Sequence, residues 1–505
     1  MGSPKRSVGP RLARSGGAAI ATALVAALPG VAAAHGLTPT YQSPLPLAVY
    51  LVGAAMTVAL SFVFVLARDM RATEPPPGRI VRVPAAVRVL LRIVGLVGWG
   101  WIMAQGIAGG SSDAAVASLF LWVFGWVGIA MLSALFVPVW EWVDPFATLH
   151  DLLAWITRRL GVQGWAVSEV PVVLRLWPAP VGLAFFVWLE LVPAVSNGTL
   201  TVVLAGYTVL TLALMAQFGR DQWRAQGETF SVWFRLLNRL SAFGVVPAED
   251  TATPEELEEL DPDAVDARVL VRRPFASALL WAPWSPPRVV LVAFGTGSII
   301  FDGLSQTVAF ASVFGAPALL PKTLLLFAFL GIIALAALAV GRLVSWGAIG
   351  AGLLPIAVGY LVAHYLTYLL IDGQRIVIAI SDPLQQGWDV FGTAFFQPVS
   401  FLPAGLIWTA QLAAVVGGHM LGAWSGHVTA QRDMEARAVA RPPRDMRHRT
   451  IKDAPLPTRR NVRTREIPLA VVMVALTTLT LWSLGQAIVV EQTTGSRASQ
   501  AAASR

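Results

Sequence analysis

The sequence predicts an all-α membrane protein, a polytopic bundle of about ten transmembrane helices after an N-terminal signal sequence. Of the 505 residues, 56% are hydrophobic and only 13% are charged, against roughly 25% charged residues in ordinary soluble domains. Apolar runs of about 20 residues recur along the chain, and each is long enough to cross a hydrocarbon core of about 30 Å as a helix. Because the chain has no cysteine, disulfides, thiolate metal sites and cysteine nucleophiles are excluded.

Residues 1–34 have the pattern of a signal sequence. Basic residues, among them Lys5 and Arg14, precede the apolar stretch 18–28, and the small residues of PGVAAA at 29–34 follow it. Cleavage after Ala34 would make His35 the first residue of the mature protein. An uncleaved first helix stays open as the alternative, because the apolar stretch overlaps in length with short membrane anchors.

The remaining apolar runs set the expected helices in chain order. Each run is assigned as a span because its length and composition suit the hydrocarbon core. We expect helices over 45–66, 87–107, 114–137, 172–195, 200–218, 289–313, 320–340, 348–371, 401–424 and 467–488.

The distribution of basic residues orients these helices. Arginines gather in every second loop, at 68–82, 158–159, 220–273, 342 and 432–465, whereas the other loops hold few basic residues, chiefly Lys322 and Arg375. The positive-inside rule places the arginine-rich loops in the cytoplasm and the C-terminal tail outside. We therefore expect a bacterial inner-membrane protein whose partner is the lipid bilayer. Its net charge of +8 is expected to orient the helices in the membrane and not to bind nucleic acid.

Two cytoplasmic segments, 140–160 and 221–240, mix aromatic and charged residues at helical spacing, so we expect helices that lie in the membrane interface. The acidic stretch 249–266 is rich in Pro and Glu and is expected to be a solvated, mobile loop. The expected organisation is a signal sequence (1–34), an N-terminal transmembrane bundle (35–218), a cytoplasmic loop with an amphipathic helix and the acidic segment (219–286), a transmembrane bundle with intramembrane Asp and His (287–424), a basic cytoplasmic loop (425–466), a last transmembrane helix (467–488) and a disordered tail (489–505).

Polar residues inside two of the spans indicate a functional site. A carboxylate such as Asp302 costs roughly 2.5 to 3.5 kcal/mol at the centre of a membrane helix, so it must face a protein interior, a wet cavity or a partner. Residues four apart share one face of a helix. Two such faces are polar: Ser298, Asp302 and Gln306 on one span, and Tyr360, His364 and Tyr368 on another.

Depth decides which of these side chains can meet. At 1.5 Å per residue, Asp302, Glu190 and His364 lie roughly 21, 23 and 27 Å from the cytoplasmic side, in the outer half of the membrane. His419 lies on a helix that runs inward and His427 lies beyond the end of that helix, so both belong to the cytoplasmic side. We predict an outer site with Asp302 and His364 as its reactive pair. The binding residues expected around the pair are Glu190, Ser298, Gln306, Tyr365 and Tyr368.

Three functions stay open for this site. A transporter of a proton, metal ion or small solute needs inward-facing polar groups and broken helices, which glycines and prolines such as Gly303 and Pro355 permit. A hydrolase needs a water activated near His364 and Asp302, and a divalent metal ion held by His35, Asp302 and His364 would be its cofactor. A structural subunit needs only hydrogen bonds between helices. No His-Glu-x-x-His, Gly-x-Ser-x-Gly, P-loop or Rossmann motif is present.

Several strings together resemble a family of bacterial polytopic membrane proteins labelled fenitrothion hydrolase. They are HGL at 35–37, FDGLSQT at 301–307, VAHY at 362–365 followed by GQ at 373–374, SDPLQQGWDVFGT at 381–393 and GH at 418–419. The resemblance runs along most of the mature chain and implies activity on an organophosphate triester. One departure is DPF at 144–146, where Asn-Pro-Trp is expected.

Overall fold

The computed structural model describes residues 56, 60, 78–110, 114–161, 168–247, 268–440 and 459–484. Over these residues the chain is mostly helical, and eight helices are long and apolar enough to cross a membrane. The predicted all-α, multi-pass fold is therefore confirmed. The signal sequence, nearly all of the span predicted at 45–66, the acidic stretch 249–266 and the tail 489–505 lie outside the described residues.

The elements follow one another in this order: β1 (Arg79–Val81), α3 (Ala85–Ala108), α4 (Val116–Ser118), the π-helix η1 (Leu119–Ile129), α5 (Ala130–Leu135), α6 (Trp140–Val143), α7 (Pro145–Arg159), α8 (Pro178–Leu191), α9 (Asn197–Phe218), α10 (Arg220–Gln226), α11 (Thr229–Leu237), β2 (Phe243–Pro247), β3 (Arg268–Arg272), α13 (Ser277–Trp281), α14 (Pro286–Ser305), α15 (Val308–Phe314), α16 (Leu319–Leu343), α17 (Trp346–Asp372), η3 (Gly373–Arg375), α18 (Ile376–Ser381), α19 (Ala404–Ala440) and α20 (Arg459–Leu484).

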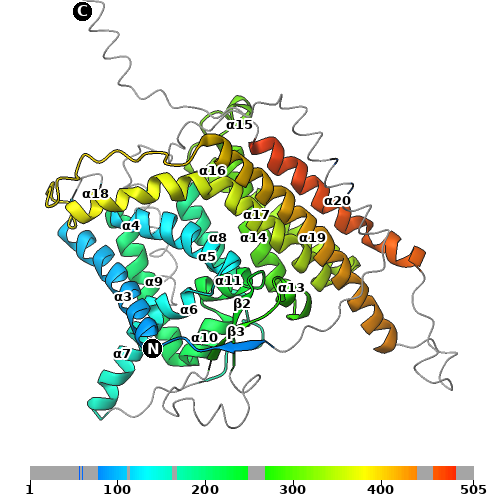
Figure 1. The fold of residues 1–505 in the computed structure, drawn as a ribbon, viewed down its shortest axis with the longest axis horizontal. Coiled ribbons are helices and arrows are strands. Elements are labelled where there is room, and N and C mark those ends of the chain that lie inside the picture. The colour runs from blue at the N-terminus through cyan, green and yellow to red at the C-terminus, as the bar shows by residue number, and fades with distance from the viewer. Residues whose placement is uncertain are drawn as a thin grey trace, which may run out of the picture.

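Helix α17 lies at the centre of the bundle. It contacts η1, α14, α16, α19 and α20, and nearly all of its residues from Gly347 to Tyr365 are buried. Figure 1 shows α14, α16, α17, α19 and α20 running side by side, with α3, α4 and α9 grouped in the other part of the molecule. A helix that is apolar on all sides is expected in such a buried position.

Glycines bring α17 and α19 into close backbone contact. A methyl group on Gly418 would lie 2.6 Å from the Pro355 carbonyl oxygen, and one on Gly422 would lie 2.4 Å from the Gly352 carbonyl oxygen. Gly426 repeats the spacing one turn later and faces the carbonyl oxygen of Ala348 at 3.1 Å. Small residues four apart are the usual means of close packing between membrane helices, because lipid supplies no hydrophobic drive for their association.

Several spans differ in length from the predictions. The span predicted at 172–195 is helical only over α8, because 172–176 form turns and the helix begins at Pro178. The span predicted at 289–313 divides into α14 and α15, where the hydroxyl of Thr307 caps the second helix by accepting from the Phe310 N–H at 3.1 Å. The helix predicted at 401–424 continues in α19 to Ala440.

Segment 221–240 is helical as expected, but α11 does not lie on the protein surface as an interfacial helix would. Helix α11 is buried in the protein core, and Trp233 stacks on Trp126 of η1 with ring centroids 5.9 Å apart. Its charged residue Arg235 forms an ion pair with Glu141 instead of facing lipid headgroups. Charges that pair inside the protein have the same helical spacing as charges that face headgroups, so the pattern alone does not separate the two.

Helix α7 exposes the apolar residues Leu152, Leu153 and Trp155, and its position in the membrane interface stays a prediction. A small antiparallel sheet, in the order β1-β3-β2, is an addition that the sequence did not indicate. In it Arg79 pairs with Arg272, and Phe243 pairs with Arg272 from the other side. The sheet covers the end of the bundle near α10, α11 and α13 (Figure 1).

Candidate functional site

Asp302 and His364 are in direct contact, as their helical spacing and depth indicated. His364 Nε2 lies 2.9 Å from Asp302 Oδ2, and the Tyr365 hydroxyl donates to the same oxygen at 2.8 Å. Gln306 donates from Nε2 to Asp302 Oδ1 at 2.8 Å. The side chains of His364 and Asp302 are only 5% and 13% exposed. Both carboxylate oxygens therefore have hydrogen-bond donors at a depth where an unpaired charge is costly.

The other predicted binding residues fall into two groups. Glu190 on α8 and Tyr368 on α17 lie within electrostatic range of Asp302, and the Tyr368 ring is 6.1 Å from that of Tyr365. Ser298, one turn before Asp302, donates its hydroxyl to the Gly295 carbonyl oxygen of its own helix at 2.9 Å. Of the three polar residues on this face, Asp302 and Gln306 therefore belong to the site, whereas the Ser298 hydroxyl bonds within its own helix.

Two further residues join the site that the sequence analysis did not assign to it. Lys322, in the first turn of α16, interacts electrostatically with Asp302. Trp126 of η1 lies beside the Tyr365 hydroxyl. Both come from elements other than the two polar helices. In the sequence, Lys322 is distinguished only as a basic residue among loops that hold few of them.

Gly303 makes room for a convergence of three helices beside Asp302. A methyl group at Gly303 would lie 2.8 Å from Ser483 Oγ, 2.9 Å from the Tyr360 hydroxyl and 3.3 Å from His364 Cε1. The Ser483 hydroxyl is buried there and has no hydrogen-bond partner in the part of the chain that the structure describes. A buried polar group of this kind calls for an explanation, such as a water molecule or a polar ligand atom.

The residues described do not include a complete metal site. No group of three His, Asp or Glu side chains that could hold a metal ion occurs among them. Asp302 and His364 supply two donors, whereas the third predicted ligand, His35, lies outside the described residues. The metal site therefore stays a prediction.

His419 and His427 do not join the Asp302 site through any contact within the described ranges. His419 is fully buried, and its Nδ1 lies 2.7 Å from the Val415 carbonyl oxygen one turn back. His427 Nδ1 lies 2.6 Å from Glu466 Oε2, and both side chains are nearly inaccessible to solvent. Glu466 falls in a predicted loop, whereas in the structure α20 begins at Arg459 and includes it.

The motif that departs from the resembled family has a structural role. Asp144 caps α7 by accepting from the Phe146 and Ala147 N–H groups, and Arg224 Nε donates to its Oδ2 at 2.9 Å. Arg224 also donates to Glu141. Burial raises the pKa of Asp144 to about 6 against the attraction of Arg224. The network joins α6, α7 and α10 and lies outside the spanning helices.

Comparison with known proteins adds no family to these observations. No protein-family model, curated protein or solved structure matches the chain. The resemblance to fenitrothion hydrolase therefore stays an expectation carried by its sequence strings. The functional argument rests on the geometry around Asp302.

Proposed function

We propose that this membrane protein takes up and releases a proton or a small cation at the Asp302 site, in the outer half of the bilayer. The observation that supports the proposal is that two carboxyl groups lie close together beside one lysine. Asp302 and Glu190 interact with each other, and Lys322 supplies one positive charge. With His364 neutral, the two carboxyl groups could both be charged only with one uncompensated negative charge, which is costly inside a membrane, so the site favours binding of a proton or a cation.

His364 is the residue that can neutralise this charge. The imidazole of a histidine can take up a proton near neutral pH, and His364 Nε2 lies 2.9 Å from Asp302 Oδ2. The donors Tyr365 and Gln306 keep the Asp302 carboxylate in place in either state. A proton on His364, or a cation beside the two carboxylates, then neutralises the site, and its departure restores the charged state.

Hydrolysis of an organophosphate triester is the alternative. A carboxylate that holds an imidazole in one orientation is the arrangement that a general base requires, and Asp302 holds His364 in this way. The Ser483 hydroxyl beside His364 would be a hydrogen-bond partner for the attacking water. The resemblance to fenitrothion hydrolase supports this alternative as well.

Replacing Asp302 by Asn tests the proposal, because the amide keeps the shape but removes the charge. We expect uptake of protons or cations into proteoliposomes to fall by about 100-fold or more, the usual scale of a proton-transfer group, with little loss of folded protein. His364→Ala should behave in the same way. The matched control is Thr296→Val on the same helix, whose buried hydroxyl donates to the Val292 carbonyl oxygen at 2.8 Å, away from the site.

The assays separate the two functions. Flux is followed with an entrapped pH or cation indicator, and hydrolysis of an organophosphate triester is followed in detergent. Hydrolysis that disappears in Asp302→Asn would establish the enzyme instead of the transporter. Full activity of the Asn variant in both assays would remove Asp302 from any functional role.

A further inference from the structure

A cavity lies far from Asp302 along α14, at the first turn of this helix. Its volume is about 300 Å³, and it is lined by residues of α6, α10, α11, β2, α13 and the start of α14 and by the loops beside them. The residues that line it are Pro138, Glu141, Leu176, Ala225, Val232, Arg235, Leu236, Asn238, Arg239, Val245, Arg273, Ala278, Ala282 and Arg288. Four arginines and one carboxylate therefore share one cavity.

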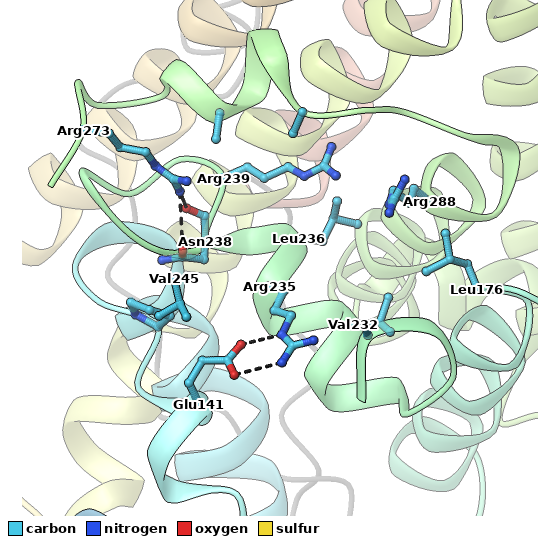
Figure 2. Close-up of a pocket in the computed structure, with 14 residues that line it drawn as sticks. Glu141, Leu176, Val232, Arg235, Leu236, Asn238, Arg239, Val245, Arg273 and Arg288 are labelled. Carbon is cyan, nitrogen blue, oxygen red and sulfur yellow. Dashed lines mark hydrogen bonds and ion pairs between the residues drawn. The ribbon is translucent and has the colours of Figure 1, made fainter. Parts of the chain in front are cut away.

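Among the described residues, one of these arginines has a carboxylate partner. Figure 2 shows Arg235 held by Glu141, and Arg239 and Arg288 reaching into the same part of the cavity. Arg239, Arg273 and Arg288 form no ion pair with any residue that the structure describes. Within the described residues, no carboxylate neutralises these three charges.

Backbone oxygens hold these three guanidinium groups in place. Arg239 Nη2 and Arg288 Nη1 both donate to the Pro283 carbonyl oxygen at 3.1 Å, and Arg273 Nη2 donates to the Asn238 carbonyl oxygen at 2.7 Å. Arg239 also lies over the Trp284 ring at 4.5 Å. Its Nη1 is buried and has no hydrogen-bond partner in the described ranges. One preorganised donor is therefore free for a ligand.

The electrostatics of the cavity favour an anion. Burial lowers the pKa of Arg239 to about 9, and the charges of Arg288 and Arg273 add to the effect. Burial also lowers the pKa of Arg273 to about 10. Like charges held together in a low-dielectric site repel one another, and a bound anion relieves that repulsion.

We propose that this cavity binds the phosphate group of an anionic ligand, with Arg239, Arg273 and Arg288 as its binding residues. A guanidinium group presents paired N–H donors that match phosphate oxygens. The apolar residues Leu176 and Val232 line another wall and would contact the rest of the ligand.

The position of the cavity indicates where the phosphate comes from. Arg288 lies in the first turn of a spanning helix, and the exposed Trp281 lies just before it, as is usual at the headgroup level of a bilayer. Basic pockets at this level bind phospholipid headgroups. A soluble phosphorylated compound has the same recognised group and is the second source.

The test compares the purified full chain with the double variant Arg239→Gln, Arg288→Gln. Native mass spectrometry measures retained phosphatidylglycerol against phosphatidylcholine, and thermal unfolding measures stabilisation by inorganic phosphate and glycerol 3-phosphate. The control is Arg342→Gln, which removes one positive charge at an exposed position in the last turn of α16, away from the cavity. We expect the wild type and the control to prefer the anionic ligand, and the double variant to bind it at least about tenfold more weakly, as loss of about 1.4 kcal/mol gives.

Each outcome decides the proposal. Selective retention of phosphatidylglycerol identifies a lipid headgroup, and stabilisation by the soluble phosphates alone identifies a free phosphorylated ligand. If the wild type shows no preference for either over phosphatidylcholine, or if the double variant binds as well as the wild type, the proposal is wrong. Should the double variant fail to fold, Arg239→Lys keeps the charge but loses the planar donors, and it should still weaken binding.

Discussion

At the scale of single residues, Asp302 shows how this fold keeps a charge inside the membrane. Its two oxygens receive bonds from Gln306 one turn away and from His364 and Tyr365 on α17. Gln306 is four residues from Asp302, so this bond forms within one stretch of chain. The bonds from His364 and Tyr365 form only when α14 and α17 lie together. The charge is therefore stable only in the assembled bundle.

Two adjacent glycines of α19 give a residue-scale prediction. Gly418→Ala should destabilise the protein by about 1–3 kcal/mol, because the added methyl group meets the Pro355 carbonyl oxygen at 2.6 Å and backbone atoms cannot give way cheaply. Gly417→Ala is the control. No heavy atom lies within 4 Å of its added methyl group, so it should be neutral or stabilising by up to about 1 kcal/mol. Thermal unfolding in one detergent measures both, and equal effects would show that α17 and α19 are not in close contact.

At the scale of elements, the proline in α17 is compensated by α19. Pro355 has no N–H, so it leaves the carbonyl oxygen of Ala351, four residues earlier, without its helical partner. The Ser425 hydroxyl of α19 donates to that oxygen at 2.7 Å. A backbone group freed inside a membrane helix is thus satisfied by a side chain of its neighbour, as the absence of water requires.

This pairing predicts a double-mutant cycle. Ser425→Ala should cost about 0.6–1 kcal/mol in the natural chain, because the Ala351 oxygen loses its donor. In a Pro355→Ala background the new N–H can take over that bond, so the same Ser425→Ala change should cost less. Unfolding of the four proteins in detergent measures the difference. Equal costs in both backgrounds would mean that Ser425 does not compensate for the proline.

The π-helix η1 is the other element that shapes the site. It brings Trp122 and Trp126 onto the buried ring of Phe186, with centroids 4.8 and 5.4 Å away. Trp126 also lies beside Tyr365. π-helical segments occur often at functional sites, and here the segment forms the wall of the Asp302 site on the side of α8.

At the scale of the whole molecule, one carboxylate joins the spanning helix α3 to α7 and α10. Asp151 of α7 accepts from Arg220 Nη1 at 2.6 and 2.7 Å, and Arg92 of α3 lies 3.0 Å from it. Burial opposes its charged form, but the bonds from His150, Arg220 and Arg92 outweigh burial and lower its pKa. The carboxylate should therefore contribute to stability in its charged form.

The sign of this shift predicts a pH dependence. A carboxyl group whose pKa is lower in the folded state stabilises the protein above its unfolded pKa of about 3.9, and the contribution is lost as pH falls through the folded value. Asp151→Asn should cost about 1 kcal/mol at neutral pH and nothing at acid pH. Glu169→Gln is the control, because this side chain is 83% exposed and should have no measurable effect. Unfolding temperatures measured from pH 7 to pH 3 check both, and a constant deficit of the Asn variant would contradict the assignment.

The sequence by itself determined the fold class, the positions of most spans and the pairing of Asp302 with His364. These follow from local geometry, since the length of an apolar run, the period of a helix and the rise per residue need no knowledge of neighbouring helices. Tertiary structure alone decided that Lys322, Trp126 and Ser483 surround this pair, and that α11 is buried. It also decided that arginines of α11, α14 and the loops beside them line one cavity. The physical reason is that two membrane helices pack together where small residues allow close contact and where buried polar groups can pair. Both conditions depend on residues that are far apart in the chain.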